Sequence, residues 1–306
     1  MNLFHKKDQY QGYNIYSMKK YVDKKRIIFT TIIVILIIIT LGFIIYYSVD
    51  TTIRLKNAKR FEQKLIEYES KQEELQKQER ERQAKIPKLT DEGKQNIKGI
   101  YISETKRVFL TFDDGPSVNT ADVLDILKSN DIKATFFVLG TQVEKMPEMV
   151  KRAYQEGHYI ANHGYSHQYS QIYSSPETVL QEFNQCNSAV AKAIDVPEYN
   201  SHLFRFPGGS VGGKYANLKA EAVTLLEQNN IMHVDWNALT GDAEKSSPDE
   251  EYLMNNLQKT TQNKNSIVIL MHDAQAKRVT VEFLPKLIEF FQQQGYQFEN
   301  FYSIIK

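Results

Sequence analysis

Residues 108–116, VFLTFDDGP, are the stretch that decides the fold. The first five form a short apolar run rich in β-branched and aromatic residues, which is typical of a buried strand. Asp113 and Asp114 follow where this strand ends, and Gly115 with Pro116 is turn chemistry. The stretch therefore predicts a buried strand that delivers two carboxylates into a turn.

Further strand-like runs alternate with amphipathic segments along the rest of the chain. The expected strands lie near residues 108–112, 134–138, 158–161, 203–206, 232–236, 267–271 and 297–300. The expected helices cover residues 120–129, 146–155, 177–194, 215–228, 249–259 and 279–293. This alternation predicts an α/β fold with a parallel sheet, either open or closed as a barrel.

Ionisable residues stand on or directly after the expected strands in four places. They are Asp113 with Asp114, His163 with His167, Arg205, and His272. In barrels and in open α/β sheets, the carboxyl ends of the strands meet on one face, where such folds place their active sites. We therefore expect these residues to be neighbours although they are far apart in the chain.

His163 and His167 are four residues apart, a spacing that lets both imidazoles reach one ion. Alone the pair is a weak signal, because histidines at this spacing are more often surface or capping residues. Asp114 strengthens it, since two histidines and one carboxylate leave an open coordination position, as in catalytic zinc sites. We expect Zn²⁺, although this donor set also accepts Co²⁺, Ni²⁺ or Mn²⁺.

A metal site of this kind suits the hydrolysis of an amide. The ion lowers the pKa of bound water to about 7 and polarises a carbonyl oxygen. Successive side chains usually diverge, so Asp114 can reach the metal while Asp113 stays free to accept the proton of the water. The sequence therefore predicts metal-assisted hydrolysis with Asp113 as the base.

Residues 27–47 contain no charged residue and are dense in Ile, Val and Leu. At about 1.5 Å per helical residue, this run fits one transmembrane helix. The basic residues just before it predict a cytoplasmic N-terminus and an external C-terminal body; they are Lys19, Lys20, Lys24, Lys25 and Arg26. A cleaved signal peptide is the alternative, but the apolar run exceeds the usual length and no small-x-small cleavage site follows.

Residues 51–86 are rich in Lys, Glu, Gln and Arg and lack Gly and Pro, which predicts a solvated helical stalk. Phe61, Tyr68 and Leu75 recur every seven residues, but their polar neighbours favour at most a weak stalk-mediated dimer. The predicted organisation is a basic cytoplasmic segment at 1–26, a transmembrane helix at 27–48, a stalk and linker at 49–98, and a catalytic domain at 99–306. Residues 89–96 are expected to be part of the connector.

The overall composition is that of a globular protein. With 42% hydrophobic residues, the chain has enough apolar material for a sizeable core. The net charge is only +1, so the charge balance gives no reason to expect nucleic acid as a partner. The single cysteine, Cys186, cannot form an intramolecular disulfide, and it falls in an apolar helical pattern where a buried free thiol is expected.

Four motifs in order resemble the polysaccharide deacetylase family, also called the NodB-homology or carbohydrate esterase 4 family. They are TFDDGP at 111–116, HGYSH at 163–167, RFPGG at 205–209 and LMH at 270–272. Their joint order makes the resemblance specific where a single motif would not be, and it covers roughly residues 105–300. The resemblance implies a distorted (β/α) barrel of about seven or eight units, here preceded by the transmembrane helix and the stalk.

The resemblance also implies a role for each motif residue. The base would be Asp113, the metal ligands Asp114, His163 and His167, and the general acid that protonates the leaving amine His272. A histidine with a pKa near 6.5 suits this donation, because the amine must be protonated before the C–N bond breaks. Arg205 would orient and tune an active-site carboxylate, with an ordinary structural ion pair as the alternative.

Three residues are candidates for contact with the substrate. By family analogy, the backbone N–H of Tyr165 would help the metal to hold the oxyanion. Pro207 belongs to the third motif. Trp236, the only tryptophan, would either pack on a sugar or methyl face or be an ordinary aromatic at a strand end.

One segment departs from the family pattern. Residues 235–243, DWNALTGDA, match the family's Asp-x-x-Asp-Trp motif only loosely. Leu239 stands at the first Asp position, Asp242 fits the second, and Ala243 stands where Trp is usual. The carboxylate that tunes the acid histidine is therefore expected to be either Asp242 or Asp235.

The expected activity is removal of acetyl groups from N-acetylglucosamine, or from N-acetylmuramic acid, in peptidoglycan or another N-acetylated polysaccharide. An external anchored domain with a complete base, metal and acid set motivates this expectation. Within the family, an O-acetyl esterase and a chitooligosaccharide deacetylase are the alternatives. A wall-glycan-binding protein with a degenerate site is the rival from another class, motivated by Leu239 and Ala243.

Overall fold

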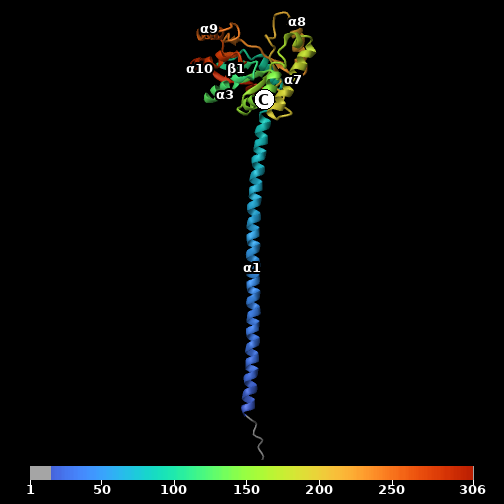
Figure 1. Ribbon diagram of the computed structural model, residues 1–306, viewed down its shortest axis with the longest axis vertical. Helices are drawn as coiled ribbons and strands as arrows, with labels where there is room; N and C mark the ends of the chain where they lie inside the picture. Colours follow the sequence, from blue (N-terminus) through green and yellow to red (C-terminus); the bar gives the residue numbers. More distant parts are fainter. Residues whose placement is uncertain (1–14, 306) are drawn as a thin grey trace, which may run out of the picture. The chain divides into compact units, whose positions relative to one another are not determined.

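The computed structural model describes residues 15–305, and it divides the chain into two compact units, Met1–Gln78 and Glu79–Lys306. Helix α1 runs from Ile15 to Ala84 and is the long element at the N-terminal side in Figure 1. The predicted transmembrane helix and most of the predicted stalk therefore belong to one helix. Part of the expected cytoplasmic segment, residues 1–14, lies outside the described residues.

The apolar part of α1 is long enough and apolar enough to cross a membrane, and its side chains are exposed. Its threonines satisfy their hydroxyl groups within the helix. Thr31 donates to the carbonyl oxygen of Ile27 at 2.8 Å, and Thr40 donates to that of Leu36 at 3.0 Å. Such back-bonding suits hydrocarbon, where an unsatisfied hydroxyl would be costly. The helix is thus compatible with a membrane anchor.

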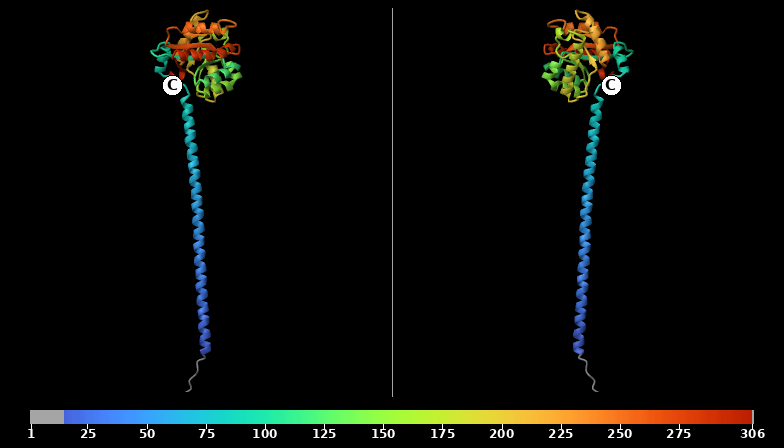
Figure 2. Two further views of the ribbon diagram at one scale, coloured as in Figure 1. Left: turned by 90° about the vertical axis from the view of Figure 1, so that its left-hand side faces the viewer. Right: turned by 90° about the vertical axis from the view of Figure 1, so that its right-hand side faces the viewer.

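A curled parallel sheet forms the centre of the second unit (Figures 1 and 2). Its strands are β1 (Arg107–Asp113), β2 (Thr135–Val138), β3 (Tyr159–Asn162), β4 (Leu203–Phe204), β5 (Met232–His233), β6 (Ala238–Leu239), β7 (Ser266–His272) and β8 (Gln297–Glu299). The order is β5-β4-β3-β2-β1-β7-β6, and β8 pairs with β1. Within residues 15–305 no ladder joins β5 to β6, so the curled sheet stays open on that side. The predicted α/β fold with a distorted barrel is confirmed in this form.

The helices of the second unit pack around this sheet, and Figure 1 labels several of them. They are α2 (Asp91–Lys98), α3 (Val118–Ser129), α4 (Gly140–Lys145), α5 (Pro147–Gln155), α6 (Tyr169–Ile172), α7 (Pro176–Ile194), α8 (Ala216–Gln228), α9 (Glu250–Thr261) and α10 (Arg278–Gln293), followed by the 3-10 turn η1 (Phe301–Ser303). The six predicted helices are confirmed to within two residues at each end. Helices α2, α4 and α6 and strand β6 were not expected.

Strand β1 is buried on both faces. Val108, Leu110 and Phe112 point into the core between the sheet and its surrounding helices. Phe109 points to the inner face, into a second cluster. Because side chains alternate along a strand, Asp113 falls on the inner face at the carboxyl end of β1, where β2 and β7 flank it.

Helix α2 fills part of the inner face and corrects the expectation of a simple connector at 89–96. Its Ile97 packs against the inner side chains of the strands, and so do Ile100, which follows the helix, and Phe301 of η1. The helix begins with a cap, in which Thr90 Oγ1 accepts a hydrogen bond from the N–H of Gly93 at 3.0 Å. The connector was expected because only one or two apolar residues mark the packed face of so short a helix.

Candidate metal and catalytic site

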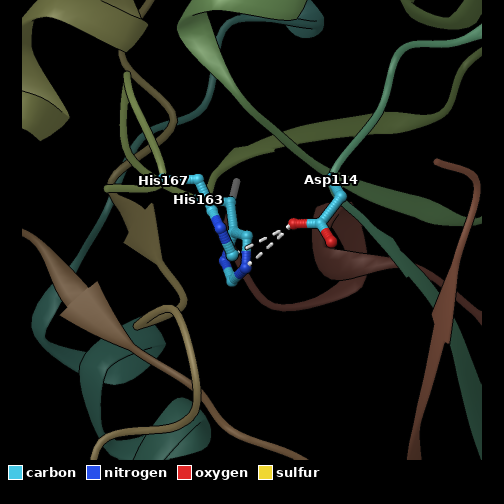
Figure 3. A group of neighbouring side chains, drawn as sticks. All are labelled: Asp114, His163 and His167. Atoms are coloured by element: carbon cyan, nitrogen blue, oxygen red, sulfur yellow. Dashed lines mark ion pairs between the residues drawn. The ribbon is translucent and has the colours of Figure 1, made fainter. Parts of the chain in front are cut away.

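Asp114, His163 and His167 each place one ligand atom within 4.8 Å of the others (Figure 3). Asp114 Oδ1 lies 3.5 Å from His163 Nε2 and 3.4 Å from His167 Nε2. Asp114 and His167 have φ of 70° and 58°, in the left-handed region that few residues with side chains adopt. The turn after β1 and the loop after β3 thus bring the three side chains together at the carboxyl end of the sheet.

Two donor atoms of this set, His163 Nε2 and Asp114 Oδ1, have lone pairs that a cation could bind. His163 Nδ1 donates to the carbonyl oxygen of Arg205 at 2.8 Å, which leaves Nε2 as the lone-pair atom on the side of Asp114. Burial lowers the pKa of His163 to about 3, so its ring is neutral. Asp114 Oδ1 is buried and has no hydrogen-bond partner in the described part of the chain. A buried carboxylate oxygen without a donor costs free energy, and a cation at this point would satisfy it.

The loop that carries the two histidines is fixed to α7 by Glu182. Its Oε2 accepts from the backbone N–H groups of Tyr165 and Ser166 at 2.6 and 2.7 Å, and its Oε1 accepts from Ser166 Oγ at 2.7 Å. The carboxylate therefore satisfies the backbone between the ligands. Glu182 was not predicted; the available signal is a charged residue on a helix face that is otherwise apolar, beside Val179, Phe183 and Cys186.

The prediction that the backbone N–H of Tyr165 holds an oxyanion is wrong. This N–H already donates to Glu182. The Tyr165 side chain packs against α4. Its hydroxyl donates to Glu144 Oε2 at 2.9 Å, and its ring lies 2.2 Å from the point where a Cβ on Gly140 would be. Sequence could not reveal this, because the competing acceptor comes from a helix that follows later in the chain.

Asp113 is buried beside the three candidate ligands and is paired with Arg205. Its Oδ1 accepts from Arg205 Nη1 at 2.8 Å, and its Oδ2 lies 3.8 Å from His163 Nε2. Burial raises the pKa of Asp113 above its usual value, and the charge of Arg205 opposes part of that rise. One carboxylate oxygen is thus held by the guanidinium while the other faces the metal set.

The guanidinium of Arg205 is itself buried and held by several acceptors. Nη1 also donates to Thr111 Oγ1 at 2.7 Å, Nε donates to the carbonyl oxygen of Val234 at 3.2 Å, and Nη2 donates to that of Asp235 at 3.0 Å. The ring of Phe137 lies 3.9 Å from the guanidinium carbon. The geometry fits the predicted tuning of Asp113 and also fits a structural ion pair, so both interpretations of Arg205 stay open.

His272 ends β7 and is paired with Asp242. Its Nδ1 lies 3.0 Å from Asp242 Oδ1, and its backbone N–H donates to Asp242 Oδ2 at 2.8 Å. Burial tends to lower the pKa of His272, but Asp242 outweighs this effect and the pKa rises to about 9. Thr280 Oγ1 also donates to Asp242 Oδ2, at 2.7 Å. Of the two carboxylates that the sequence left open, Asp242 is therefore the one that contacts His272.

The other carboxylate, Asp235, has a different set of partners. Its Oδ2 accepts from Ser210 Oγ at 2.6 Å, and its two oxygens accept from the Ser210 N–H at 3.0 and 3.1 Å. Leu239 lies on β6, and Ala243 is exposed after it. The altered segment thus keeps a carboxylate on the acid histidine although it lacks the family's usual Asp and Trp.

Asp273 is a buried carboxyl beside the site that was not predicted. Its Oδ2 accepts from Thr120 Oγ1 at 2.5 Å, whereas its Oδ1 finds no partner within residues 15–305. Burial raises its pKa to about 7. A Cβ on Gly115 would lie 2.3 Å from Asp273 Oδ2, so glycine is required where the turn after Asp114 passes this carboxyl.

The two remaining substrate candidates lie beside Arg205. Pro207 is buried, and its carbonyl oxygen accepts from the Tyr173 hydroxyl at 2.6 Å. Trp236 is half-buried, with its ring 3.4 Å from the point where a Cβ on Gly209 would be. Their contact with a substrate stays a prediction.

The comparisons with known proteins bear on the same part of the chain. The sequence model described as polysaccharide deacetylase matches residues 102–225. A peptidoglycan-N-acetylglucosamine deacetylase of Bacillus cereus is 33% identical over 205 residues, which cover 65% of this chain and 71% of that relative. The chain belongs to the polysaccharide deacetylase family. This confirms the expected family and, with it, the expected class of hydrolase.

Other relatives of the polysaccharide deacetylase family agree in sequence and in fold. The putative polysaccharide deacetylase YheN of Bacillus subtilis is 36% identical over 63% of this chain and 66% of its own length. The structure of a Streptococcus mutans CE4 esterase matches with a TM-score of 0.62 and 30% identity, over 68% of this chain and 90% of that one. The catalytic domain of a peptidoglycan N-acetylglucosamine deacetylase from Eubacterium rectale matches with a TM-score of 0.59 and 31% identity, over 65% and 90%. This family is metal-dependent, and the set of Asp114, His163 and His167 could hold the ion.

Proposed function

We propose that this chain removes acetyl groups from N-acetylglucosamine in peptidoglycan. The observation that carries the proposal is the buried, unsatisfied Asp114 Oδ1 beside two histidine Nε2 atoms. Asp113 and His272 pair in register at the carboxyl ends of the neighbouring strands β1 and β7. Relatives named peptidoglycan-N-acetylglucosamine deacetylase, at 33% and 30% identity, support this substrate.

Asp114, His163 and His167 would hold the divalent ion, for which we propose Zn²⁺. Two imidazole nitrogens and one carboxylate oxygen form the donor set that leaves coordination positions open. When bound there, such an ion polarises the acetyl carbonyl and makes water a better nucleophile at neutral pH. Co²⁺, Ni²⁺ and Mn²⁺ remain alternatives for the same donors.

Asp113 would act as the general base. Arg205 Nη1 occupies Oδ1, so Oδ2, which faces His163, is the oxygen that would take the proton from the attacking water. The hydrogen bond to Arg205 holds the carboxylate in one orientation, and the buried site gives it a raised pKa. A base with a raised pKa accepts a proton more readily than an ordinary aspartate.

His272 would act as the general acid. Asp242 takes its Nδ1–H, so the Nε2–H is the group that would donate to the leaving nitrogen. The proton then resides on the glucosamine nitrogen as the C–N bond breaks, and the products are acetate and a free amine. The raised pKa of about 9 keeps His272 protonated at neutral pH, ready for this donation.

The alternatives differ in the bond that is cleaved or in whether any bond is cleaved. An O-acetyl esterase would use the same base and metal. An alkoxide is a better leaving group than an amide anion, so ester cleavage depends less on a general acid than amide cleavage does. The Asp242 contact with His272 therefore favours an amide substrate. It also weighs against a degenerate glycan-binding protein, as does the set of three candidate ligands. A chitooligosaccharide deacetylase shares the chemistry and differs in the glycan alone.

We further propose that α1 anchors the protein in the cell membrane with a single pass. The apolar run and the basic residues before it support a cytoplasmic N-terminus and an extracellular catalytic domain. A weak stalk-mediated dimer stays part of this proposal. Protease treatment of intact cells should release the catalytic domain; full protection of that domain would contradict the external location.

We propose the organisation into segments 1–26, 27–48, 49–98 and 99–306, with one qualification. Helix α2 falls inside the expected linker but packs into the core through Ile97. A fragment that begins after α2 would lose this packing. A catalytic fragment should therefore begin near Glu79, where the second compact unit begins.

The test is acetate release by the full chain in detergent. Metal-free protein is incubated with N-acetylated peptidoglycan and with O-acetylated glycan, each with Zn²⁺, Co²⁺, Ni²⁺ or Mn²⁺. We expect acetate from the N-acetylated substrate and free glucosamine amines in the fragments by mass spectrometry. The control D113N should bind metal and fall in rate by at least about 100-fold. Release from the O-acetylated glycan alone, or no release with any metal, would overturn the proposal.

A further inference from the structure

Tyr169 presents an aromatic ring at the edge of the metal set. It is the first residue of α6 and follows the candidate ligand His167 by two positions. Its side chain is 42% exposed, and its ring centroid lies 5.6 Å from that of His167, with the rings edge to face. Its hydroxyl makes no hydrogen bond to any residue from 15 to 305, so this donor is open to a ligand.

The loop that carries Arg205 leaves room for this ring. A Cβ on Gly208 would lie 2.7 Å from the Tyr169 hydroxyl oxygen and 3.3 Å from its Cζ. Gly208 is exposed and has φ of 75°. Tyr169 thus occupies the volume that a side chain at position 208 would take, and the absence of one lets the ring lie across the loop.

Residues behind Tyr169 hold the ring in place. The ring of Tyr173 lies 5.6 Å from it, edge to face, and the Tyr173 hydroxyl donates to the carbonyl oxygen of Pro207. The buried Lys219 places its Nζ 4.8 Å from the Tyr173 ring and donates to the carbonyl oxygen of Gly209 at 2.6 Å. The exposed face of Tyr169 is therefore backed by a packed and hydrogen-bonded cluster, which lowers the entropy lost when a ligand binds to it.

We propose that Tyr169 contacts the sugar ring whose acetyl group lies at the metal set. A pyranose has an apolar C–H face and hydroxyl groups at its rim, and a tyrosine offers a matching apolar face and polar tip. The Tyr169 ring is in edge-to-face contact with the His167 ring, with the centroids 5.6 Å apart, so a sugar whose acetyl group lies at the metal set would lie next to Tyr169. The inference rests on the proposed glycan substrate, and it gives Tyr169 a role in binding and none in proton transfer.

Kinetics of Y169F and Y169A with two substrates test this role. One substrate is an N-acetylglucosamine oligomer, and the other is 4-nitrophenyl acetate, which has no sugar. We expect Y169A to raise KM for the oligomer by about 5-fold to 10-fold, as for loss of an aromatic contact, and to leave kcat/KM for the ester unchanged. Y169F should raise KM for the oligomer by less, and this smaller rise measures the contribution of the hydroxyl group alone. The matched control is Y296F. Tyr296 lies at the amino ends of the strands, next to Gln297, which pairs with Arg107, so Y296F should leave KM and kcat unchanged for both substrates.

A binding measurement keeps the inference separate from turnover. In the D113N background, calorimetry of the oligomer should show a Kd that rises when Y169A is added, with metal content unchanged. An unchanged KM and Kd in Y169A would overturn the inference while leaving the proposed activity intact. Equal losses with both substrates would also overturn it, because they would indicate a structural role. Absence of oligomer binding by D113N itself would contradict it as well.

Discussion

Replacing Asp242 by Asn tests the part of the site that departs most from the family pattern. The carboxylate accepts from His272 Nδ1 at 3.0 Å and from the backbone N–H of His272 at 2.8 Å. D242N keeps the size and an acceptor oxygen but removes the negative charge. The substitution therefore removes the main influence that raises the pKa of His272 to about 9.

The expected magnitude follows from the protonated fraction of the acid. A general acid works only when protonated, so activity is present below its pKa and is lost as pH rises through it. At pH 8, a group of pKa about 9 is roughly 90% protonated, whereas one of pKa about 6.5 is roughly 3% protonated. D242N should thus lower kcat at pH 8 by about 30-fold, with a much smaller loss near pH 6. This figure takes the pKa of His272 in D242N as 6.5, the value at which burial, which lowers the pKa, is balanced by Asp113 and Asp114, which raise it.

The assay is the pH profile of acetate release from an N-acetylglucosamine oligomer with saturating metal. The alkaline limb should move from near pH 9 toward pH 6.5 in D242N. D235N is the matched control, because Asp235 bonds to Ser210 and not to His272, and its alkaline limb should stay in place. An unmoved limb in D242N, or an equal shift in D235N, would refute the assignment of Asp242 to the acid.

Three further predictions concern the supports of the site. E182Q should weaken metal affinity by about 10-fold to 100-fold, because Glu182 holds the loop between the two histidines; a metal titration measures it, and unchanged affinity would contradict that role. R205M should lower the free energy of unfolding by about 3 to 5 kcal/mol, because it leaves Asp113 buried without its partner; urea unfolding measures it, and a change below about 1 kcal/mol would contradict a buried pair. I97A should lower the free energy of unfolding by about 2 to 5 kcal/mol in the same urea experiment, because Ile97 is buried in the inner core. An unchanged free energy of unfolding, as expected for a residue in an unpacked linker, would contradict this packing.

The longer elements could be predicted because their patterns are strong. The buried run of β1 and the amphipathic helices α7 and α10 each carry enough apolar residues to define a period. The two residues of β6 stand between the polar residues Asn237 and Thr240, without the longer apolar runs that contain β4 and β5. Helix α6 has four residues, too few to define a period. Helix α2 was mistaken for a connector for the same reason, although it contributes to the inner core.

The site could be predicted where strand order alone decides the outcome. Asp113, His163 and His272 meet because parallel strands end on one face, and this follows from the alternation of strands and helices. The contacts that arrive from helices or loops could not be read in the same way. Glu182 reaches the histidine loop from α7, and its carboxylate takes the N–H of Tyr165 that was expected to face the substrate. The choice between Asp235 and Asp242 likewise depended on the path of the chain after β5.

The most direct measurement is acetate release from peptidoglycan by the full chain before and after removal of its metal, with mass spectrometry of the fragments. We expect no acetate from chelator-treated protein, recovery when Zn²⁺ is added, and free amines on N-acetylglucosamine. The triple variant of Asp114, His163 and His167 to Ala should not recover. Acetate release that persists without metal, or in this variant, would contradict a metal-dependent deacetylase built on these three residues.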